Sequence, residues 1–564
     1  MRTANQRSSF LLLLLVLLPT ELLLLSHHLE ARTLTDQVRE MIRARIEEAG
    51  IPAKITVGED PVLAALALPR FYENRSYQPA WVGDQGPLPE VESLRGAISQ
   101  ATGEGLRAED YHWRKIVAIL EELKENREKG KPRNLRRLVD LDLLLTDAFL
   151  IYGSHLLGGF VNPETIHPEW NATRREKDLV EVLQLALDGS QIEKTLKDLL
   201  PSHPGYSKLR EALLTYRKLA KKADWSKIPA GPALKEGKYD ERVTLLKIRL
   251  LASGDLEKEL ETDEKFFDDI LDEAVRRFQK RHGLDIDGIV GPVTLAALNV
   301  PLSERVRQIE LSLERWRWLP QSLGERYLLV NIANFELEVV ENNNLIMNMR
   351  AVVGRSYRST PVFSDRVSYL VLSPYWHVPP SIASKDMLPL IQKEPDYFDK
   401  QGIKVFIGWG AEAKELDSKS IDWSKVTSKN FPYRLRQDPG AKNALGQVKF
   451  MFPNKFNVYL HDTPAQELFQ KAARAFSSGC IRIEKPIELS EYLLKGDPKW
   501  GRENVLGAIA KGIEQTVSLL RPIPIYLLYW TAWVDDDGQV HFREDIYGRD
   551  ALLDQALQEK APIN

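Results

Sequence analysis

Cys480 is the only cysteine in the 564-residue chain, and its neighbours are residue types that make a thiol reactive. It directly follows Gly479, and Arg482 comes two positions later. A glycine lets the backbone approach a ligand, and a nearby cation favours the thiolate form of cysteine. His461 lies upstream and is the candidate base. The pattern predicts a Cys480 thiolate paired with protonated His461, and backbone N–H groups around Gly479 and Cys480 that stabilise an oxyanion.

Three interpretations of this cysteine are open on these residues alone: an inert buried thiol, an intermolecular disulfide, or a nucleophile. The flanking elements bear on the choice because a nucleophile must be held beside its base. Residues 457–460 are typical of the end of a β-strand that Pro464 stops, which puts His461 at the strand exit. Residues 465–476 have apolar side chains at helical spacing and predict a helix with Lys471 and Arg474 on its outer face. After the loop, Pro486 is suited to start a second helix.

The stretches H-D-T-P from His461 and S-S-G-C-I-R-I from Ser477 resemble the signature of L,D-transpeptidases, the cysteine enzymes that cross-link bacterial peptidoglycan. Residues 350–363, 374–389 and 434–454 are similar to further blocks of the same catalytic domain, in the expected order. One position departs from the pattern, because Ser478 stands where many members have histidine. The large, capped subgroup resembles this chain in having serine there, so the base role is expected to fall on His461 alone.

The resemblance implies a set of site residues. Cys480, His461 and Gly479 would be catalytic, and Arg482 would bind a substrate carboxylate or, on the plainer interpretation, form a surface ion pair. The further residues expected to bind substrate are Ser477, Ser478, Tyr459 and Trp376.

The implied reaction is acyl transfer through a Cys480 acyl-enzyme, with release of D-alanine from a tetrapeptide stem and formation of a third-to-third-residue cross-link. Two alternatives remain open: an L,D-carboxypeptidase that uses the same nucleophile with water, and a non-catalytic peptidoglycan-binding scaffold. A carbapenem, from a β-lactam class that acylates this family, would separate the enzyme from the scaffold. The usual serine acyl-transfer signatures are missing from the sequence. No H-E-x-x-H motif occurs and the 10 histidines do not cluster, so no metal or other cofactor is expected.

Patterns and resemblance together predict an α+β, multidomain chain. We expect a signal peptide at 1–31, a mostly helical N-terminal scaffold at 32–235, a small helical peptidoglycan-binding-like module at 236–301, a mainly antiparallel β catalytic domain at 302–545 and a C-terminal tail at 546–564. An inserted capping subdomain is expected at about 385–440. Within the module, helical faces, Gly283 and Pro292 predict two short helices joined by glycine turns.

Composition and the first residues bear on location and partners. A charged fraction of 28% and a net charge of −3 give no strong field for nucleic acid, which excludes that class of partner. Arg2 and Arg7 precede an apolar run, so residues 1–31 are interpreted as a secretory signal and the protein is expected in the periplasm. Membrane contact is expected only if the signal stays uncleaved. The expected partners are peptidoglycan stem peptides, with glycan synthases and carboxypeptidases as further candidates.

Overall fold

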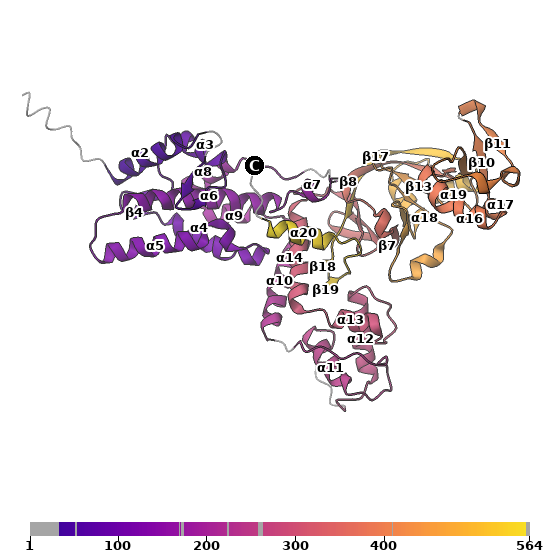
Figure 1. Cartoon of the computed structure of the whole chain (residues 1–564), viewed down its shortest axis with the longest axis horizontal. Coiled ribbons are helices and arrows are strands. Elements are labelled where there is room, and N and C mark those ends of the chain that lie inside the picture. Colours follow the sequence, from indigo (N-terminus) through magenta and orange to yellow (C-terminus); the bar gives the residue numbers. More distant parts are fainter. Residues whose placement is uncertain are drawn as a thin grey trace, which may run out of the picture.

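The N-terminal scaffold is built from helices around one long buried helix (Figure 1). The computed structural model describes residues 33–50, 54–168, 170, 174–222, 225–257, 263–408 and 410–559, so the predicted signal peptide lies outside the described residues. The scaffold helices are α2 (Leu34–Glu47), α3 (Ala67–Asn74), α4 (Glu90–Ser99), α5 (Trp113–Glu128), α6 (Leu135–Gly158), α7 (Pro163–Ile166), α8 (Leu179–Asp188) and α9 (Ile192–Lys197). Two short hairpins join them: β1 (Thr56–Val57) with β2 (Asp60–Pro61), and β3 (Val82–Gly83) with β4 (Gly86–Pro87).

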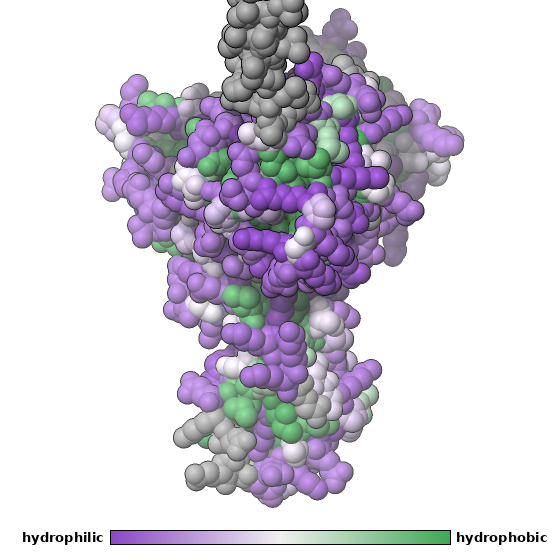
Figure 2. Space-filling model, turned by 90° about the vertical axis from the view of Figure 1, so that its left-hand side faces the viewer, coloured by the Kyte–Doolittle hydropathy of each residue, from purple (hydrophilic) through white to green (hydrophobic). Residues whose placement is uncertain are grey.

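Helix α6 forms the centre of the scaffold core. Among the described residues, it alone is long and apolar enough to cross a membrane, yet 94% of the tested window is buried inside the protein. Phe71, Tyr72 and Trp81 are fully buried against it. The outer face of the scaffold in Figure 2 is mainly hydrophilic, interrupted by small apolar areas. The length of α6 is therefore explained by its role as a core helix.

Two helices outside the β-domain pack against it. Helix α10 (Pro204–Lys222) lies against α14 (Leu302–Arg317), and buried residues of both helices belong to the same core cluster as the β-domain. Arg317 is fully buried and donates to Glu314, to the Tyr206 hydroxyl and to the Glu104 carbonyl of the scaffold. Residues expected in the scaffold thus also build the catalytic half, because the polar network and the apolar core cross that boundary.

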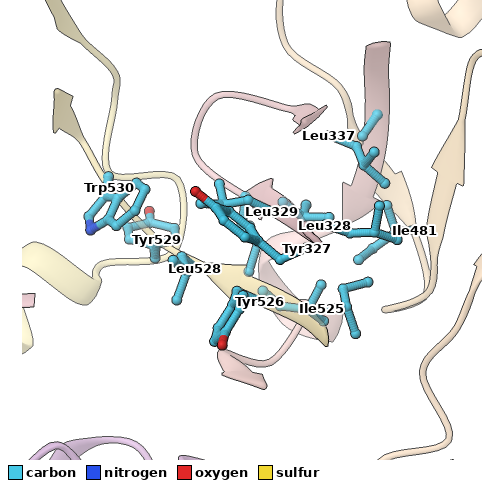
Figure 3. Close-up of a cluster of buried hydrophobic side chains, with 14 of the residues drawn as sticks. Tyr327, Leu328, Leu329, Leu337, Ile481, Ile525, Tyr526, Leu528, Tyr529 and Trp530 are labelled. Carbon is cyan, nitrogen blue, oxygen red and sulfur yellow. The ribbon is translucent and has the colours of Figure 1, made fainter. Parts of the chain in front are cut away.

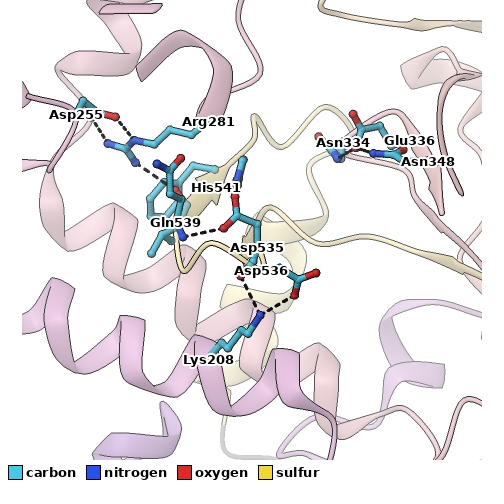
Figure 4. Close-up of polar contacts among 12 residues, drawn as sticks. Lys208, Asp255, Arg281, Asn334, Glu336, Asn348, Asp535, Asp536, Gln539 and His541 are labelled. Atoms are coloured by element: carbon cyan, nitrogen blue, oxygen red, sulfur yellow. Dashed lines mark hydrogen bonds and ion pairs between the residues drawn. The ribbon is translucent and has the colours of Figure 1, made fainter. Parts of the chain in front are cut away.

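The small module has the predicted helical form. Its helices are α11 (Arg242–Ala252), α12 (Asp269–Arg281) and α13 (Pro292–Leu298), with an apolar core of their own. Gly283 follows α12 with φ of 66°, and Pro292 begins α13, as the turn pattern predicts. Figure 4 shows the buried ion pair of Arg281 with Asp255 inside the module. Arg281 also donates to the Val540 carbonyl, which attaches the module to the C-terminal part of the chain.

The catalytic half is a closed β-barrel. Within the described residues, nine strands form one sheet in the order β15-β7-β16-β14-β13-β8-β17-β5-β6, and β6 pairs again with β7 to close the ring. Most neighbours are antiparallel, but β14 with β16, β15 with β7, and β17 with β5 are parallel. The strands are β5 (Arg326–Asn331), β6 (Glu336–Glu341), β7 (Asn344–Gly354), β8 (Phe363–Leu372), β13 (Val448–Met451), β14 (Leu460–His461), β15 (Ala475–Ser477), β16 (Ile481–Ile483) and β17 (Gln515–Leu528). The predicted mixed α+β, multidomain class is confirmed.

The barrel core holds the strand that follows the cysteine. Figure 3 shows Ile481 among buried side chains of β5, β6 and β17. Because Ile481 is fully buried, it fixes the position of Cys480, the preceding residue, at the barrel wall. Outside the barrel, α18 (Pro486–Leu493) begins at the predicted proline and packs against α19 (Arg502–Ala510).

The inserted segment is a subdomain with its own sheet and core. Its strands β9 (Trp376–His377), β10 (Ile403–Ile407), β11 (Lys414–Leu416) and β12 (Arg434–Gln437) pair in the order β11-β10-β12-β9. Helices α15 (Pro380–Ile382), α16 (Leu388–Lys393) and α17 (Tyr397–Gln401) accompany them, and Phe398 and Trp423 lie in the separate core. At its base, buried Asn443 donates to the Pro374 carbonyl and so joins the entry and exit of the insertion. We call residues 376–437 the inserted subdomain.

The helix predicted at 465–476 is wrong. The segment contains a 3-10 turn, η8 (Gln466–Gln470), and then strand β15, which pairs with β7. Arg474, expected on a solvent face, is buried and donates to the carbonyls of Ala351 and Phe335. Helical spacing was overridden by tertiary pairing, because the guanidinium satisfies the carbonyls of the barrel edge.

The segment expected as a C-terminal tail is folded onto the domain. After the hairpin β18 (Ala532–Val534) with β19 (Val540–Phe542), helix α20 (Arg549–Gln558) packs against α14. Leu553 is fully buried, and Asp550 pairs with Arg315 and accepts from Thr531. The short apolar face of α20 was too weak a signal in the sequence to indicate this packing.

Candidate active site

Strand register brings the predicted nucleophile and base to one face of the barrel. Strands β14 and β16 run parallel, with Leu460 opposite Ile481 and His461 opposite Arg482. Leu460 and Ile481 are fully buried in the core. Since side chains alternate along a strand, the residues beside these two point to the other face. Tyr459, His461, Cys480 and Arg482 therefore share the outer face of the barrel wall.

Lys449 joins this group, although its sequence pattern did not single it out. It lies opposite His461 in the antiparallel pairing of β13 with β14. Its Nζ atom is 4.1 Å from the centre of the Tyr459 ring. The available signal was the alternation in β13, where Val448 and Phe450 are buried and Lys449 lies between them. The site thus contains a second cation besides Arg482.

The Cys480 side chain is half-buried at the end of a tight loop. Gly479 has φ of +116°, a conformation that side-chain-bearing residues rarely adopt, so glycine is required there. The Cys480 Sγ donates to the Asn457 carbonyl at 3.8 Å. Burial raises the pKa of the Cys480 thiol. Hydrogen bonds from Tyr459 and the positive charges of Lys449 and Arg482 lower that pKa, but they offset the rise only in part. The resting sulfur is accessible but protonated.

His461 is buried with a defined hydrogen bond. Only 5% of its surface is exposed, and Nδ1 lies 2.5 Å from the Asp462 carbonyl oxygen. A carbonyl only accepts, so Nδ1 carries the proton and Nε2 has the free lone pair. Burial, with smaller effects of Arg482 and Lys449, lowers the pKa of His461 to about 3. The imidazole is neutral at pH 7, ready to accept a proton.

The protonation state differs from the predicted ion pair. A raised thiol pKa and a lowered imidazole pKa both favour the neutral forms of Cys480 and His461. Within the described residues, no hydrogen bond joins the two side chains; the thiol donates to Asn457 instead. The reason is desolvation, which penalises both charged forms in the same buried face. The arrangement suits general-base activation of a thiol better than a preformed thiolate.

Of the two backbone donors predicted, at Gly479 and Cys480, the loop engages the first and leaves the second free within the described residues. The Gly479 N–H donates to the Ser477 hydroxyl at 3.1 Å, and that hydroxyl donates to the Cys480 carbonyl at 2.5 Å. By contrast, the Cys480 N–H has no acceptor among the described residues. Cys480 itself therefore supplies the free N–H at this loop, and Ser477 organises the turn.

Arg482 lies in the site without a partner carboxylate. It is half-buried, and its Nε atom is buried with no hydrogen-bond partner within the described residues. Burial, then the nearby Arg355, lowers the pKa of the Arg482 guanidinium. Among the described residues no ion pair includes Arg482, so the expected surface pair is absent there. An anionic group entering this face would meet an unsatisfied cation.

Ser478 and Trp376 are not part of the group of side chains on the barrel face, although Ser478 is only two residues from Cys480. Ser478 is exposed, and its hydroxyl accepts from Arg358 at 3.0 Å. Arg358 also forms an ion pair with Asp386 of the inserted subdomain. Trp376 lies in β9 and packs on the core of that subdomain. A cavity of about 470 Å³ at the base of the insertion includes Asp462 and Thr463, the two residues after His461.

Among the described residues, no group of three or more histidine, cysteine, aspartate or glutamate side chains is placed to hold a metal ion. The cluster on the barrel face consists of a thiol, an imidazole, two cations and a backbone donor. That set can perform nucleophilic acyl transfer with general-base help.

Three parts of the chain match known protein families. Residues 325–500 match the family described as "L,D-transpeptidase catalytic domain", residues 239–298 match "Putative peptidoglycan binding domain", and residues 66–213 match "Scaffold domain". A curated protein of Haemophilus influenzae named "Putative L,D-transpeptidase" is 33% identical over 254 residues, 45% of this chain. The chain spans 50% of that relative's length.

Two solved structures are also similar. An L,D-transpeptidase from Xylanimonas cellulosilytica is 16% identical with a TM-score of 0.18, covering 53% of this chain and 99% of that chain. An L,D-transpeptidase from Stackebrandtia nassauensis is 14% identical with a TM-score of 0.21, covering 52% of this chain and 94% of that chain. Superpositions this weak carry no argument about fold or function.

Proposed function

Because the chain carries an L,D-transpeptidase catalytic domain and a peptidoglycan-binding domain, we propose that it forms third-to-third-residue cross-links in peptidoglycan with Cys480 as nucleophile. The observation that carries the proposal is the register of β14 and β16, which aligns Tyr459, His461, Cys480 and Arg482 on one face. The neutral imidazole with a free Nε2 supports a base role.

In the first half-reaction, the Cys480 sulfur attacks the carbonyl between the third residue, a diamino acid, and the terminal D-alanine of a tetrapeptide stem. His461 Nε2 takes the thiol proton as the S–C bond forms. The Cys480 N–H stabilises the oxyanion of the tetrahedral intermediate. When the C–N bond breaks, His461 gives the proton to the departing D-alanine amine, and a thioester remains.

In the second half-reaction, the side-chain amine of a diamino acid on another stem attacks the thioester. His461 now accepts the amine proton and returns it to the leaving sulfur, which regenerates the thiol. One amide is exchanged for another, so the reaction needs no ATP. Arg482 is proposed to bind a carboxylate of the donor stem, because its guanidinium has no carboxylate partner within the described residues. Tyr459 packs beside both reacting groups.

Peptidoglycan-acting domains imply a substrate and a location in the cell envelope. We further propose the periplasm, with residues 1–31 as the export signal. Glycan synthases and carboxypeptidases that supply tetrapeptides are proposed partners. The inserted subdomain is proposed to cap the site, since Arg358 connects its Asp386 to Ser478 beside the nucleophile.

The proposal is tested by product analysis with purified disaccharide-tetrapeptide. Wild type should release D-alanine and form cross-linked dimers, and Cys480→Ala and His461→Ala should form none. Free tripeptide without dimers would replace the transpeptidase by an L,D-carboxypeptidase. No product together with no covalent carbapenem adduct on the wild-type protein would leave only the peptidoglycan-binding scaffold.

A further inference from the structure

The loop that carries the nucleophile rests on a second loop, residues 354–360, which we call the cradle loop. The Arg355 N–H donates to the Ser477 carbonyl at 3.0 Å. The Thr360 hydroxyl donates to the Gly479 carbonyl at 2.9 Å. These bonds reach both ends of the turn that precedes Cys480. The position of the turn is therefore set by the cradle loop as well as by the barrel strands.

The Thr360 hydroxyl is placed to donate to the Gly479 carbonyl. Thr360 is fully buried, and its oxygen accepts the Gly354 N–H at 3.0 Å. Because that N–H can only donate, the hydroxyl hydrogen is available for the Gly479 carbonyl, its acceptor at 2.9 Å. Gly354 makes this close approach possible: a Cβ there would lie 2.9 Å from the Thr360 nitrogen, and still closer to the Arg358 carbonyl. The hydroxyl is thus a fixed donor.

Holding the Gly479 carbonyl also orients the next N–H. The Gly479 carbonyl and the Cys480 N–H belong to the same peptide plane, and in a trans peptide they point in opposite directions. A bond that draws the carbonyl towards Thr360 therefore turns the Cys480 N–H away from the cradle loop. That N–H has no acceptor among the described residues. Because residue 479 is glycine, which has no Cβ, the backbone itself gives little resistance to rotation of this plane.

The cradle loop is held in turn by the C-terminal segment. The Tyr547 hydroxyl donates to the Gly354 carbonyl at 2.5 Å and accepts the Thr360 N–H at 3.3 Å. The Arg549 guanidinium donates to the Thr360 carbonyl at 3.0 Å. Tyr547 stacks on Tyr529, whose hydroxyl accepts the Tyr547 N–H. Both ends of the loop are therefore tied to residues beyond 325–500, the range that matches the catalytic domain family.

We propose that Thr360, supported by Tyr547 and Arg549, is a positioning residue that aims the Cys480 N–H at the oxyanion formed during acyl transfer. The inference rests on the proposed function, because it concerns the same nucleophile. Thr360 acts through the Gly479–Cys480 peptide and touches neither the sulfur nor the imidazole. Its effect should appear in reactions that form an oxyanion and be absent from reactions that do not.

Two reactions of the Cys480 thiol differ in whether an oxyanion forms. A carbapenem acylates Cys480 through a tetrahedral oxyanion, whereas iodoacetamide alkylates it at an sp³ carbon without one. Both adducts are counted by intact mass on the full-length protein. Thr360→Val keeps the side-chain shape and removes the hydroxyl. It should slow acylation tenfold or more and leave alkylation within about twofold, since loss of a whole oxyanion donor costs about 100-fold or more.

Further variants make the test specific. Thr360→Ser restores the hydroxyl and should recover most of the acylation rate. Tyr547→Phe should lower acylation in the same direction but less, because Thr360 keeps its own bond. It also provides the test if Thr360→Val does not fold. Thr294→Val removes another buried hydroxyl, one bonded to Gln279 in the small module, and should change neither rate.

Two results would overturn the inference. Acylation of Thr360→Val within twofold of wild type would show that the hydroxyl does not aim the N–H. An equal fall of acylation and alkylation would show that the loop has merely unravelled. For Tyr547→Phe too, an unchanged acylation rate or an equal fall of acylation and alkylation would contradict the inference. If wild-type protein gave no carbapenem adduct at all, the proposed function would fail, and that outcome is distinct from both.

Discussion

We expect Cys480 to react with iodoacetamide as a thiol that is neutral at rest, more slowly than a free thiol in solution, and not as a preformed thiolate. The prediction follows from the two pKa shifts in the site. Burial lowers the pKa of His461 from 6.5 to about 3 and raises the pKa of the Cys480 thiol. At about 1.4 kcal/mol per pKa unit, protonating this imidazole costs roughly 5 kcal/mol more than in water. An imidazolium–thiolate pair is therefore a minor species in the unliganded protein.

The sign of the pH dependence follows from which form reacts. The thiolate is the reacting species, and its fraction grows with pH until the raised thiol pKa is passed. The alkylation rate should therefore climb about tenfold per pH unit between about pH 6 and 8, without a plateau. At pH 7 it should be slower than that of glutathione measured in parallel. His461→Ala should leave alkylation within about twofold while it strongly reduces carbapenem acylation, which needs the base.

The measurement is direct because the chain has a single cysteine, so each mass increment reports on Cys480. A pH-independent alkylation rate between about pH 5 and 7 would refute the neutral pair, because only a preformed thiolate gives one. Loss of that plateau in His461→Ala would assign the thiolate to an ion pair with this imidazole. In that case desolvation would not be the dominant influence on the site.

Three further predictions concern contacts around the site. Lys449→Met should slow alkylation at about pH 8 by about threefold or more, because the charge of Lys449 lowers the pKa of the Cys480 thiol. Lys449→Arg keeps the charge and should not slow alkylation. Equal alkylation rates for the two variants would contradict this role of the charge. Asp255→Asn leaves Arg281 buried without its partner and should lower the free energy of unfolding by about 3–5 kcal/mol in urea titrations; a loss below about 1 kcal/mol would contradict the buried pair. Arg358→Gln should increase hydrogen exchange in the inserted subdomain around Asp386, and unchanged exchange would show that this ion pair does not restrain it.

The local pattern was sufficient for the elements that short-range chemistry defines. Pro486 begins α18 as predicted, and Asn342 and Asn343, both with positive φ, form the turn that joins β6 to β7. His461 ends strand β14, near the predicted strand exit, but the strand begins only at Leu460 and not at residue 457. In each case the deciding interaction lies within a few residues: a missing N–H, a left-handed turn residue, or alternation along one strand.

Long-range pairing explains the errors. Residues 465–476 have the spacing of a helix, but β15 pairs with β7 and Arg474 satisfies carbonyls of the same barrel edge. Lys449 was missed because its nearness to Tyr459 depends on the β13–β14 register. Neither pairing is visible in a window of a dozen residues. The expected C-terminal tail contains α20 for the same reason, since its partners lie in α14 and at Thr531.

The sequence by itself determined that one thiol, one nearby histidine and one arginine are available to this site, and which short elements carry them. The tertiary structure decided that they share a face, that both reacting groups are neutral at rest, and that the Cys480 N–H rather than that of Gly479 is left for an oxyanion. The physical reason is that side-chain identity is local, whereas strand register, desolvation and the direction of a peptide plane depend on contacts between distant segments.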